Sequence, residues 1–219
     1  KKSISLFPNS ADAYSNLGRI LKGLGELDEA KKLMQKAIEL KPDFASAYNT
    51  LGNILTELYD FKQAEISIRK AILLKPNFAE AYSNIGNTLQ KQGKFQEAEI
   101  SVRKAIKLKP NFANAYLNLG NILRDIGKLK EAEIFYSKAI SLKTDFSLAL
   151  NNRSQVFFEM KKFDLALKDA DKCNTKNSRA FALEILYSLG KIDEIYERIK
   201  NTANLDDKNI RLAAFSSFI

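Results

Sequence analysis

The chain has 219 residues, 45% hydrophobic and 28% charged, which is typical of a globular protein and far from a disordered or collagen-like chain. It contains no His and a single Cys. These counts exclude an intrachain disulfide, Cys-cluster metal sites, His-based catalysis and the commonest zinc and haem ligands. We therefore expect no catalytic residue, metal or cofactor in the chain. The formal net charge of +9 keeps acidic partners under consideration.

A period of 34 residues organises the sequence from its first turn onward. The four prolines lie 34 residues apart, at Pro8, Pro42, Pro76 and Pro110. Other residue types recur with the same period: Tyr14, Tyr48, Tyr82 and Tyr116; Gly18, Gly52, Gly86 and Gly120; Ala30, Ala64, Ala98 and Ala132; Ala37, Ala71, Ala105 and Ala139. A fixed period of this length is the signature of a tandem-repeat protein. The expected segments are the end of a preceding repeat at 1–10, repeats at 11–44, 45–78, 79–112 and 113–146, a degenerate repeat at 147–180, and C-terminal helices with a partial repeat at 181–219.

Each repeat has the apolar spacing of two helices. In the third repeat, Tyr82, Ile85 and Leu89 fall at i, i+3 and i+7, and a second stripe begins at Phe95. The turn near Gly93 separates the two stripes, and each Pro separates one repeat from the next. The sequence therefore predicts helical hairpins with helices of about 14 residues.

The Gly18 column lies in the middle of the first helix, where Gly costs about 1 kcal/mol relative to Ala. We expect close helix approach to offset this cost, with the Ala30 and Ala37 columns supplying small surfaces on the facing helix. One hairpin cannot bury both of its apolar stripes, so neighbouring repeats must stack.

These columns, over residues 11–146 and more weakly over 147–200, resemble the tetratricopeptide repeat (TPR) family. The resemblance implies an all-α fold, a right-handed superhelical solenoid of tandem helix-turn-helix repeats. The fifth repeat departs from the pattern, with Arg153-Ser154 in place of Leu-Gly, and Cys173 takes a small-residue position that predicts a buried thiol.

The C-terminal region breaks the period. A hairpin turn at Gly190 arrives about five residues early, so the geometry of 176–186 stays open, and a last helix is expected to begin near Asp206 or Asp207. Both ends of the chain carry apolar residues where the end of a solenoid should be polar, and we expect a segment of a longer polypeptide.

Asparagines form two columns opposite the apolar stripe of the first helices. The first column is Asn16, Asn84, Asn118 and Asn152, interrupted by Thr50; the second is Asn53, Asn87 and Asn121. Residues three apart share a helix face, so the two columns are parallel. An amide offers a donor and an acceptor together, which suits the backbone of an extended peptide. The alternative is that these side chains bond locally to neighbouring helices.

The columns resemble the asparagine ladder in the superhelix of O-linked N-acetylglucosamine transferases, where first helices line a concave groove. This resemblance implies a peptide-binding groove that also includes variable positions such as Asn49 and Arg124. A carboxylate clamp for acidic chaperone tails is not expected, because Ser15, Asn49 and Ser83 stand where its lysines should be.

The basic excess is periodic as well, in the columns that begin at Lys36 and Lys41. Both lie near the ends of second helices, where cations complement the helix dipole, so we do not expect a nucleic-acid partner. No segment is long and apolar enough to span a membrane.

The function predicted is therefore noncatalytic binding of a protein or peptide segment. One alternative is a substrate-recruiting arm of a larger glycosyltransferase- or oxygenase-like enzyme; self-association through the terminal repeats is another. Composition and the lack of a targeting signal favour a bacterial cytoplasmic protein.

Overall fold

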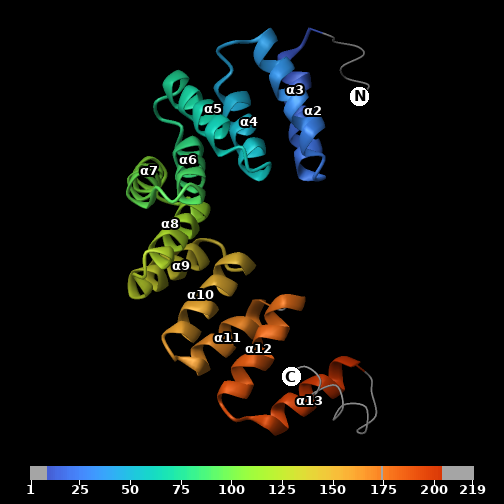
Figure 1. Cartoon of the computed structure of the whole chain (residues 1–219), viewed down its shortest axis with the longest axis vertical. Helices are drawn as coiled ribbons and strands as arrows, with labels where there is room; N and C mark the ends of the chain where they lie inside the picture. The colour runs from blue at the N-terminus through green and yellow to red at the C-terminus, as the bar shows by residue number, and fades with distance from the viewer. Residues whose placement is uncertain (1–8, 174, 204–219) are drawn as a thin grey trace. The chain divides into compact units, whose positions relative to one another are not determined.

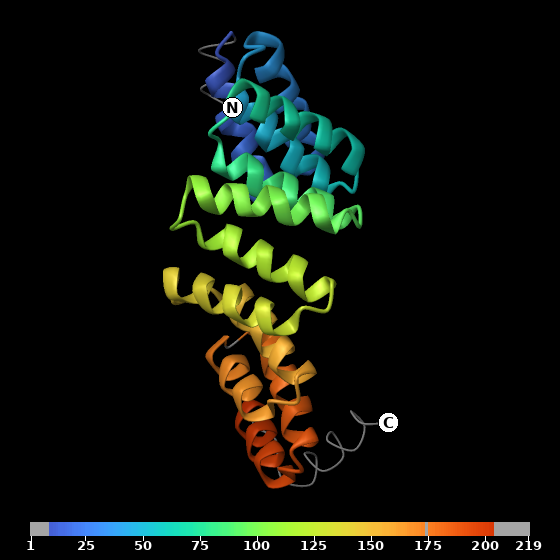
Figure 2. The ribbon, with the colours of Figure 1, turned by 90° about the vertical axis from the view of Figure 1, so that its left-hand side faces the viewer.

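A computed structural model describes residues 9–173 and 175–203, which form twelve α-helices and no β-strand. The helices run back and forth as consecutive hairpins (Figures 1 and 2). The predicted all-α class and the tandem helical hairpins are confirmed. Residues 1–8 of the predicted end of a preceding repeat (1–10) lie outside the described residues, as does the last helix expected to begin near Asp206 or Asp207. The chain divides into two compact units, one ending at Lys128 and the other beginning at Leu129.

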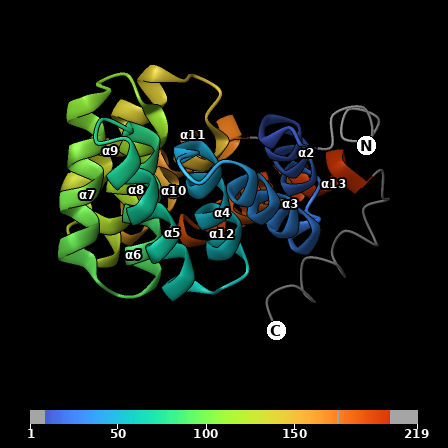
Figure 3. The ribbon, with the colours of Figure 1, turned by 90° about the horizontal axis from the view of Figure 1, so that it is seen from above.

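The first unit contains three complete hairpins and one further helix. Its first helices are α2 (Ala11–Gly23), α4 (Ala45–Glu57), α6 (Ala79–Lys91) and α8 (Ala113–Asp125). Its second helices are α3 (Leu27–Leu40), α5 (Phe61–Leu74) and α7 (Phe95–Leu108). The first helices have 13 residues and the second helices 14, close to the predicted length. The two helices of the first hairpin, α2 and α3, lie side by side in Figures 1 and 3.

The core of the first unit lies between the two helices of each hairpin and the next first helix. Ala30, Met34, Ala37, Ala47 and Ile54 are fully buried there. The small alanines let the helices approach, and the larger side chains fill the remaining space. Each second helix also packs on the first helix of the following hairpin, so the hairpins stack as the sequence predicts.

The mid-helix glycines lie where two helices approach most closely. A Cβ atom built on Gly52 would lie 2.2 Å from Ile68 Cγ1, and one on Gly86 would lie 2.2 Å from Val102 Cγ2. The carbonyl oxygens of Ala64 and Ala98 lie 3.1 Å from the same positions. The predicted close approach is confirmed, and the Ala30 column takes part in it through its backbone carbonyls. The second neighbour is the large residue four positions later in the facing helix, Ile68 or Val102, and not the Ala37 column.

Each hairpin turn contains one residue with left-handed backbone. In three turns of the regular period this residue is a glycine, for example Gly93 with φ +76°, because glycine has no Cβ to clash there. In two others it is Tyr59, with φ +62°, and Lys161, with φ +58°. At these two residues the left-handed backbone conformation costs roughly 1–2 kcal/mol per residue, because both have a Cβ atom.

The linkers between hairpins use the lysine column that begins at Lys41. In the first unit, Lys41, Lys75 and Lys109 cap the second helices, and the backbone N–H of Lys41 donates to the carbonyl of Ala37. The Nζ of Lys41 lies 5.0 Å from the ring centre of Phe44, and the same stacking recurs in the next two linkers. This column therefore has a structural role as a cation over an aromatic ring.

The second unit contains α9 (Leu129–Leu142), α10 (Ser147–Glu159), α11 (Phe163–Cys173), α12 (Lys176–Ser188) and α13 (Ile192–Ala203). Arg153 and Ser154, the residues of this unit that replace Leu-Gly of the repeat pattern, both form hydrogen bonds. The guanidinium of Arg153 donates to both carboxylate oxygens of Asp169, at 2.6 and 2.8 Å, and to Ser137 Oγ at 2.8 Å. Ser154, which replaces the glycine, is fully buried and donates to the carbonyl of Ala166 at 2.7 Å.

The early turn at Gly190 has a simple origin. Helix α11 has 11 residues against the 14 of the second helices in the first unit. Helix α12 begins at Lys176, five residues before the regular period would start a first helix, and the turn at Gly190 is shifted by the same five residues. Thr175 begins α12 with a reciprocal capping box to Ser178, so 176–186 is continuous helix. Cys173 is buried, as predicted.

Candidate peptide-binding face

The asparagine columns lie on the first helices, which pack directly against one another in the first unit: α2 with α4, α4 with α6, and α6 with α8. Consecutive second helices show no comparable packing in the part of the chain described. The first helices therefore form one continuous layer. We call the surface that carries the asparagines of α4, α6 and α8 the amide face.

The first asparagine column joins neighbouring helices. Asn84 Nδ2 donates to Asn49 Oδ1 at 2.9 Å, and Asn118 Nδ2 donates to Ser83 Oγ at 3.0 Å and to the Ser83 carbonyl at 3.3 Å. Asn49 and Ser83 are both buried. Each of these contacts links a residue to the one 35 positions away, on the adjacent first helix. The alternative of local bonding thus holds for the amide nitrogens of Asn84 and Asn118.

The second column is different. Asn53 and Asn87 are half-buried one turn further along α4 and α6, and their side chains have no hydrogen-bond partner within the described residues. Their donors and acceptors are therefore available to a ligand. Asn121, the third member, has an interaction of its own and is not counted with them. The structure brings Asn53 and Asn87 together with the bonded column on the amide face.

The remaining predicted site residues have separate environments. Asn16 is exposed on α2, and no earlier first helix is described for it to contact. Asn152 belongs to α10 in the second unit and already has an interaction of its own. Arg124 lies 3.7 Å from its neighbour Asp125.

The variable column that begins at Lys22 connects first helices as well. Lys22 Nζ donates to Glu57 at 2.6 Å, and Gln90 donates to Asp125 at 2.7 Å. Sequence reasoning missed Glu57 and Asp125, and it did not pair Ser83 with Asn118. The two residues of each pair are 35 positions apart, which is one repeat of 34 residues plus one. This spacing could have identified the partners from the sequence.

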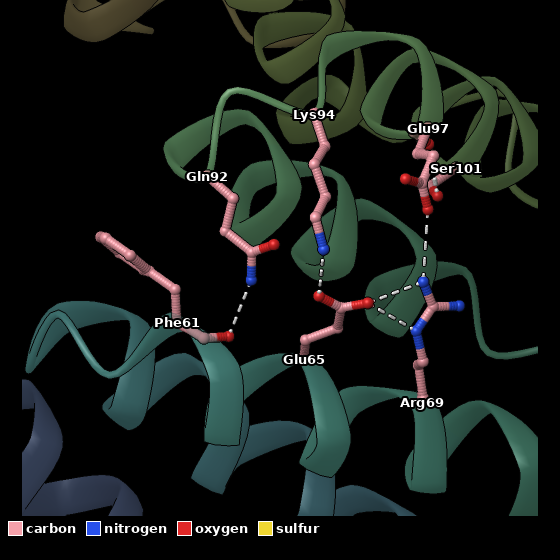
Figure 4. A network of polar contacts seen from close by, with 7 residues as sticks. All are labelled: Phe61, Glu65, Arg69, Gln92, Lys94, Glu97 and Ser101. Atoms are coloured by element: carbon pink, nitrogen blue, oxygen red, sulfur yellow. Dashed lines mark hydrogen bonds and ion pairs between the residues drawn. The ribbon is translucent and has the colours of Figure 1, made fainter.

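The opposite side of the repeats, on the second helices, carries a network of charges (Figure 4). Glu65 accepts from Arg69 Nε at 2.9 Å and from Lys94 Nζ at 3.1 Å, and Arg69 reaches Glu97 at 3.5 Å. Burial alone would raise the pKa of Glu65, but these hydrogen bonds outweigh it and hold the pKa below its ordinary value. The network ties α5 to α7.

A pocket of about 640 Å³ lies in the second unit between α11, α12 and α13. Its lining includes Lys176, Arg179 and Leu183 of α12 and a bidentate pair of Arg198 with Asp171. This pairing raises the pKa of Arg198 further above its already high value. Over residues 9–173 and 175–203, no group of three or more Asp, Glu, His or Cys residues is placed to hold a metal ion.

The fold and these faces define a helical-repeat protein in which successive hairpins of each unit pack through periodic contacts. Models of the tetratricopeptide repeat match at 11–44, 45–78, 79–112 and 113–146. The chain belongs to the tetratricopeptide repeat family. The narrower resemblance to the superhelix of O-linked N-acetylglucosamine transferases stays a prediction.

Solved structures share this fold. PilF of Pseudomonas aeruginosa is 20% identical, with 93% of this chain and 96% of that chain covered and a TM-score of 0.74. PilW, a type IV pilus biogenesis factor, is 18% identical, with 93% and 98% covered and a TM-score of 0.78. YrrB, described as a TPR protein with an unusual peptide-binding site, is 23% identical, with 86% and 96% covered and a TM-score of 0.57. A comparison with curated proteins gave no match. None of the helices described is long and apolar enough to cross a membrane.

Proposed function

We propose that this chain is a noncatalytic interaction module that binds an extended peptide segment along the amide face. One observation carries the proposal: Asn53 and Asn87 are half-buried, recur once per repeat, and have no partner in the described part of the chain. Within the described residues no buried side-chain nitrogen or oxygen lacks a hydrogen-bond partner, so the unpartnered amides of Asn53 and Asn87 are reachable from solvent and open to a ligand. A bacterial origin and a location in the cytoplasm remain predictions.

The two asparagine columns have different roles in this binding. Asn84 and Asn118 hold successive first helices in register through their hydrogen bonds to Asn49 and Ser83. That register fixes the spacing of Asn53 and Asn87 before any ligand arrives, which reduces the ordering cost of association. Amide side chains bond the backbone of a peptide and leave its side chains unread, so the amide face should tolerate many sequences.

The fold neighbours are compatible with this role. YrrB is described as having a peptide-binding site, and its fold is the one found here. TPR proteins typically bind protein partners, and this general property supports a protein ligand for the present chain.

The test starts from peptides selected by display of random 12-residue sequences on the full chain, which supplies a probe without knowledge of the natural partner. We expect the double change Asn53→Ala with Asn87→Ala to weaken the affinity of a selected peptide by about 30-fold in calorimetric titration, because two lost hydrogen bonds cost about 1 kcal/mol each. The matched control is Asn77→Ala with Asn111→Ala, which removes two exposed asparagines from the linkers. Equal affinities of both double variants and the parent would reject the amide face as the binding surface.

A further inference from the structure

The second helices α5 and α7 expose large aliphatic side chains at regular positions. Ile66 is 60% exposed, Leu73 72% and Ile100 71%. Ile66 and Ile100 occupy the same position of consecutive repeats, and Leu73 lies two turns after Ile66 on the same face of α5. The preceding repeat carries Lys32 at this position, so the repeat fold does not require an aliphatic residue there. These side chains are not used by the core or by the amide face.

The exposed residues of α5 and α7 border one another. Arg69, three residues after Ile66, forms an ion pair with Glu97, which is three residues before Ile100. Residues three apart share a helix face, so each isoleucine lies on the face of its helix that carries the Arg69–Glu97 pair. The two aliphatic positions therefore belong to one surface. We call it the second-helix stripe: Ile66, Lys70, Leu73, Ile100, Lys104 and Lys107.

The unpaired charges of this surface are all positive. The three acidic residues on α5 and α7 are all paired: Glu65 with Arg69 and Lys94, Glu97 with Arg69, and Glu99 with Arg103. Lys70, Lys104 and Lys107 are exposed and have no ion pair within the described residues. An apolar strip beside uncompensated cations fits a partner that presents apolar side chains together with carboxylates.

We propose that the second-helix stripe docks an acidic amphipathic helix from another protein. Such a helix places apolar side chains at i, i+3 or i+4, and i+7 against Ile66, Leu73 and Ile100, and its flanking Glu or Asp residues against the lysines. A second copy of this chain would bring the same positive stripe and repel. An anionic membrane fits less well, because the Arg69–Glu97 pair lies between the isoleucines and lipid contact would have to desolvate it.

The probe is a fluorescein-labelled peptide of about 20 residues with Leu at helical spacing and Glu at the flanking positions, titrated with the full chain at low salt. Saturable binding is expected, and Ile66→Glu with Ile100→Glu should weaken it by about tenfold or more. Lys70→Glu with Lys104→Glu should weaken it similarly and should create binding of a matched peptide with Lys in place of Glu. Circular dichroism of both variants is the check that they remain folded.

The control variant is Ile20→Glu with Leu24→Glu, which places two charges on aliphatic residues that are 59% and 68% exposed outside the stripe. It should bind the acidic peptide like the parent. The proposal is overturned by absence of saturable binding, or by unchanged affinity of the Ile66→Glu, Ile100→Glu variant. Cosedimentation of the parent, but not of that variant, with phosphatidylserine vesicles would also overturn it, in favour of a membrane surface. None of these three results depends on whether the amide face binds a peptide.

Discussion

At the scale of single residues, the hairpin turns show where the repeat has accepted a less favourable side chain. Lys161 adopts the left-handed conformation that Gly93 adopts in an equivalent turn. We expect Lys161→Gly to increase the free energy of unfolding by about 0.5–1 kcal/mol, since relief of the backbone strain exceeds the added entropy of glycine in the unfolded chain. Urea unfolding followed by circular dichroism measures the change.

Gly93→Ala is the reverse experiment and should destabilise by a similar amount, because alanine would adopt φ +76° there. Tyr59→Gly should gain less than Lys161→Gly, since the Tyr59 ring loses its edge contact with Phe61, at 6.0 Å between centres. A decrease in stability for Lys161→Gly would contradict the strain assigned to this turn.

The two asparagine columns give a second prediction at this scale. Asn118→Ala removes the hydrogen bonds to Ser83 and should lower the free energy of unfolding by about 1 kcal/mol. Asn87→Ala removes no hydrogen bond in the described structure and should change stability by less than about 0.5 kcal/mol. Chemical denaturation of both variants makes the comparison. Equal losses would show that the columns do not have separate roles.

At the scale of helices, the packing of α6 on α7 depends on the missing side chain of Gly86. A methyl group there would lie 2.2 Å from Val102 Cγ2 and 3.1 Å from the Ala98 carbonyl, and the carbonyl has little freedom to move. We expect Gly86→Ala to destabilise by about 1–3 kcal/mol through overpacking, despite the better helix propensity of alanine. Thermal unfolding of the variant tests this.

Gly23→Ala is the matched control, because Gly23 is also helical and a Cβ there meets no atom within 4 Å. Its expected effect is a small stabilisation, up to about 1 kcal/mol, from helix propensity alone. If Gly86→Ala stabilised the protein as well, close approach would not explain the glycine column.

Most of the helical architecture could be predicted from the sequence, because a period of 34 residues repeats one hairpin and its few glycines mark the turns and close contacts. The amide face could be predicted only in part. The pattern placed asparagines in two columns, but whether an amide points to a ligand or to the next helix depends on its partner 35 residues away. The partner position is occupied by Asn49 in one repeat and Ser83 in the next, so no repeating residue type identified it. The shift before Gly190 comes with a shortened α11 and an early start of α12, and neither change has a strong sequence signal.

At the scale of the whole molecule, acid should weaken polar contacts within and between hairpins. The pKa of Glu65 and that of Glu80, which bonds Lys109, both lie below the ordinary value of 4.5. A carboxylate with a lowered pKa contributes stability that is present above its unfolded pKa and is lost as the pH falls through its folded pKa. Stability should therefore decline once the pH drops below about 4.5.

Glu65→Gln should flatten this decline, because the variant has one ionisable carboxylate fewer in the junction. Thermal unfolding measured between about pH 3 and pH 7 would show a smaller acid-induced drop than the parent. Glu29→Gln, a change at an exposed carboxylate of α3, serves as the control. An equal drop in all three proteins would remove Glu65 from the explanation.

The step of 35 residues that joins successive first helices also bears on how such a chain can gain or lose a repeat. Loss of 45–78 would bring Asn84 opposite Ser15, which is the kind of pairing that Asn118 makes with Ser83. The same loss would bring Lys22 opposite Lys91, two cations where Lys22 now meets Glu57. The amide contacts are thus interchangeable between copies, whereas the charged contacts are specific to one junction.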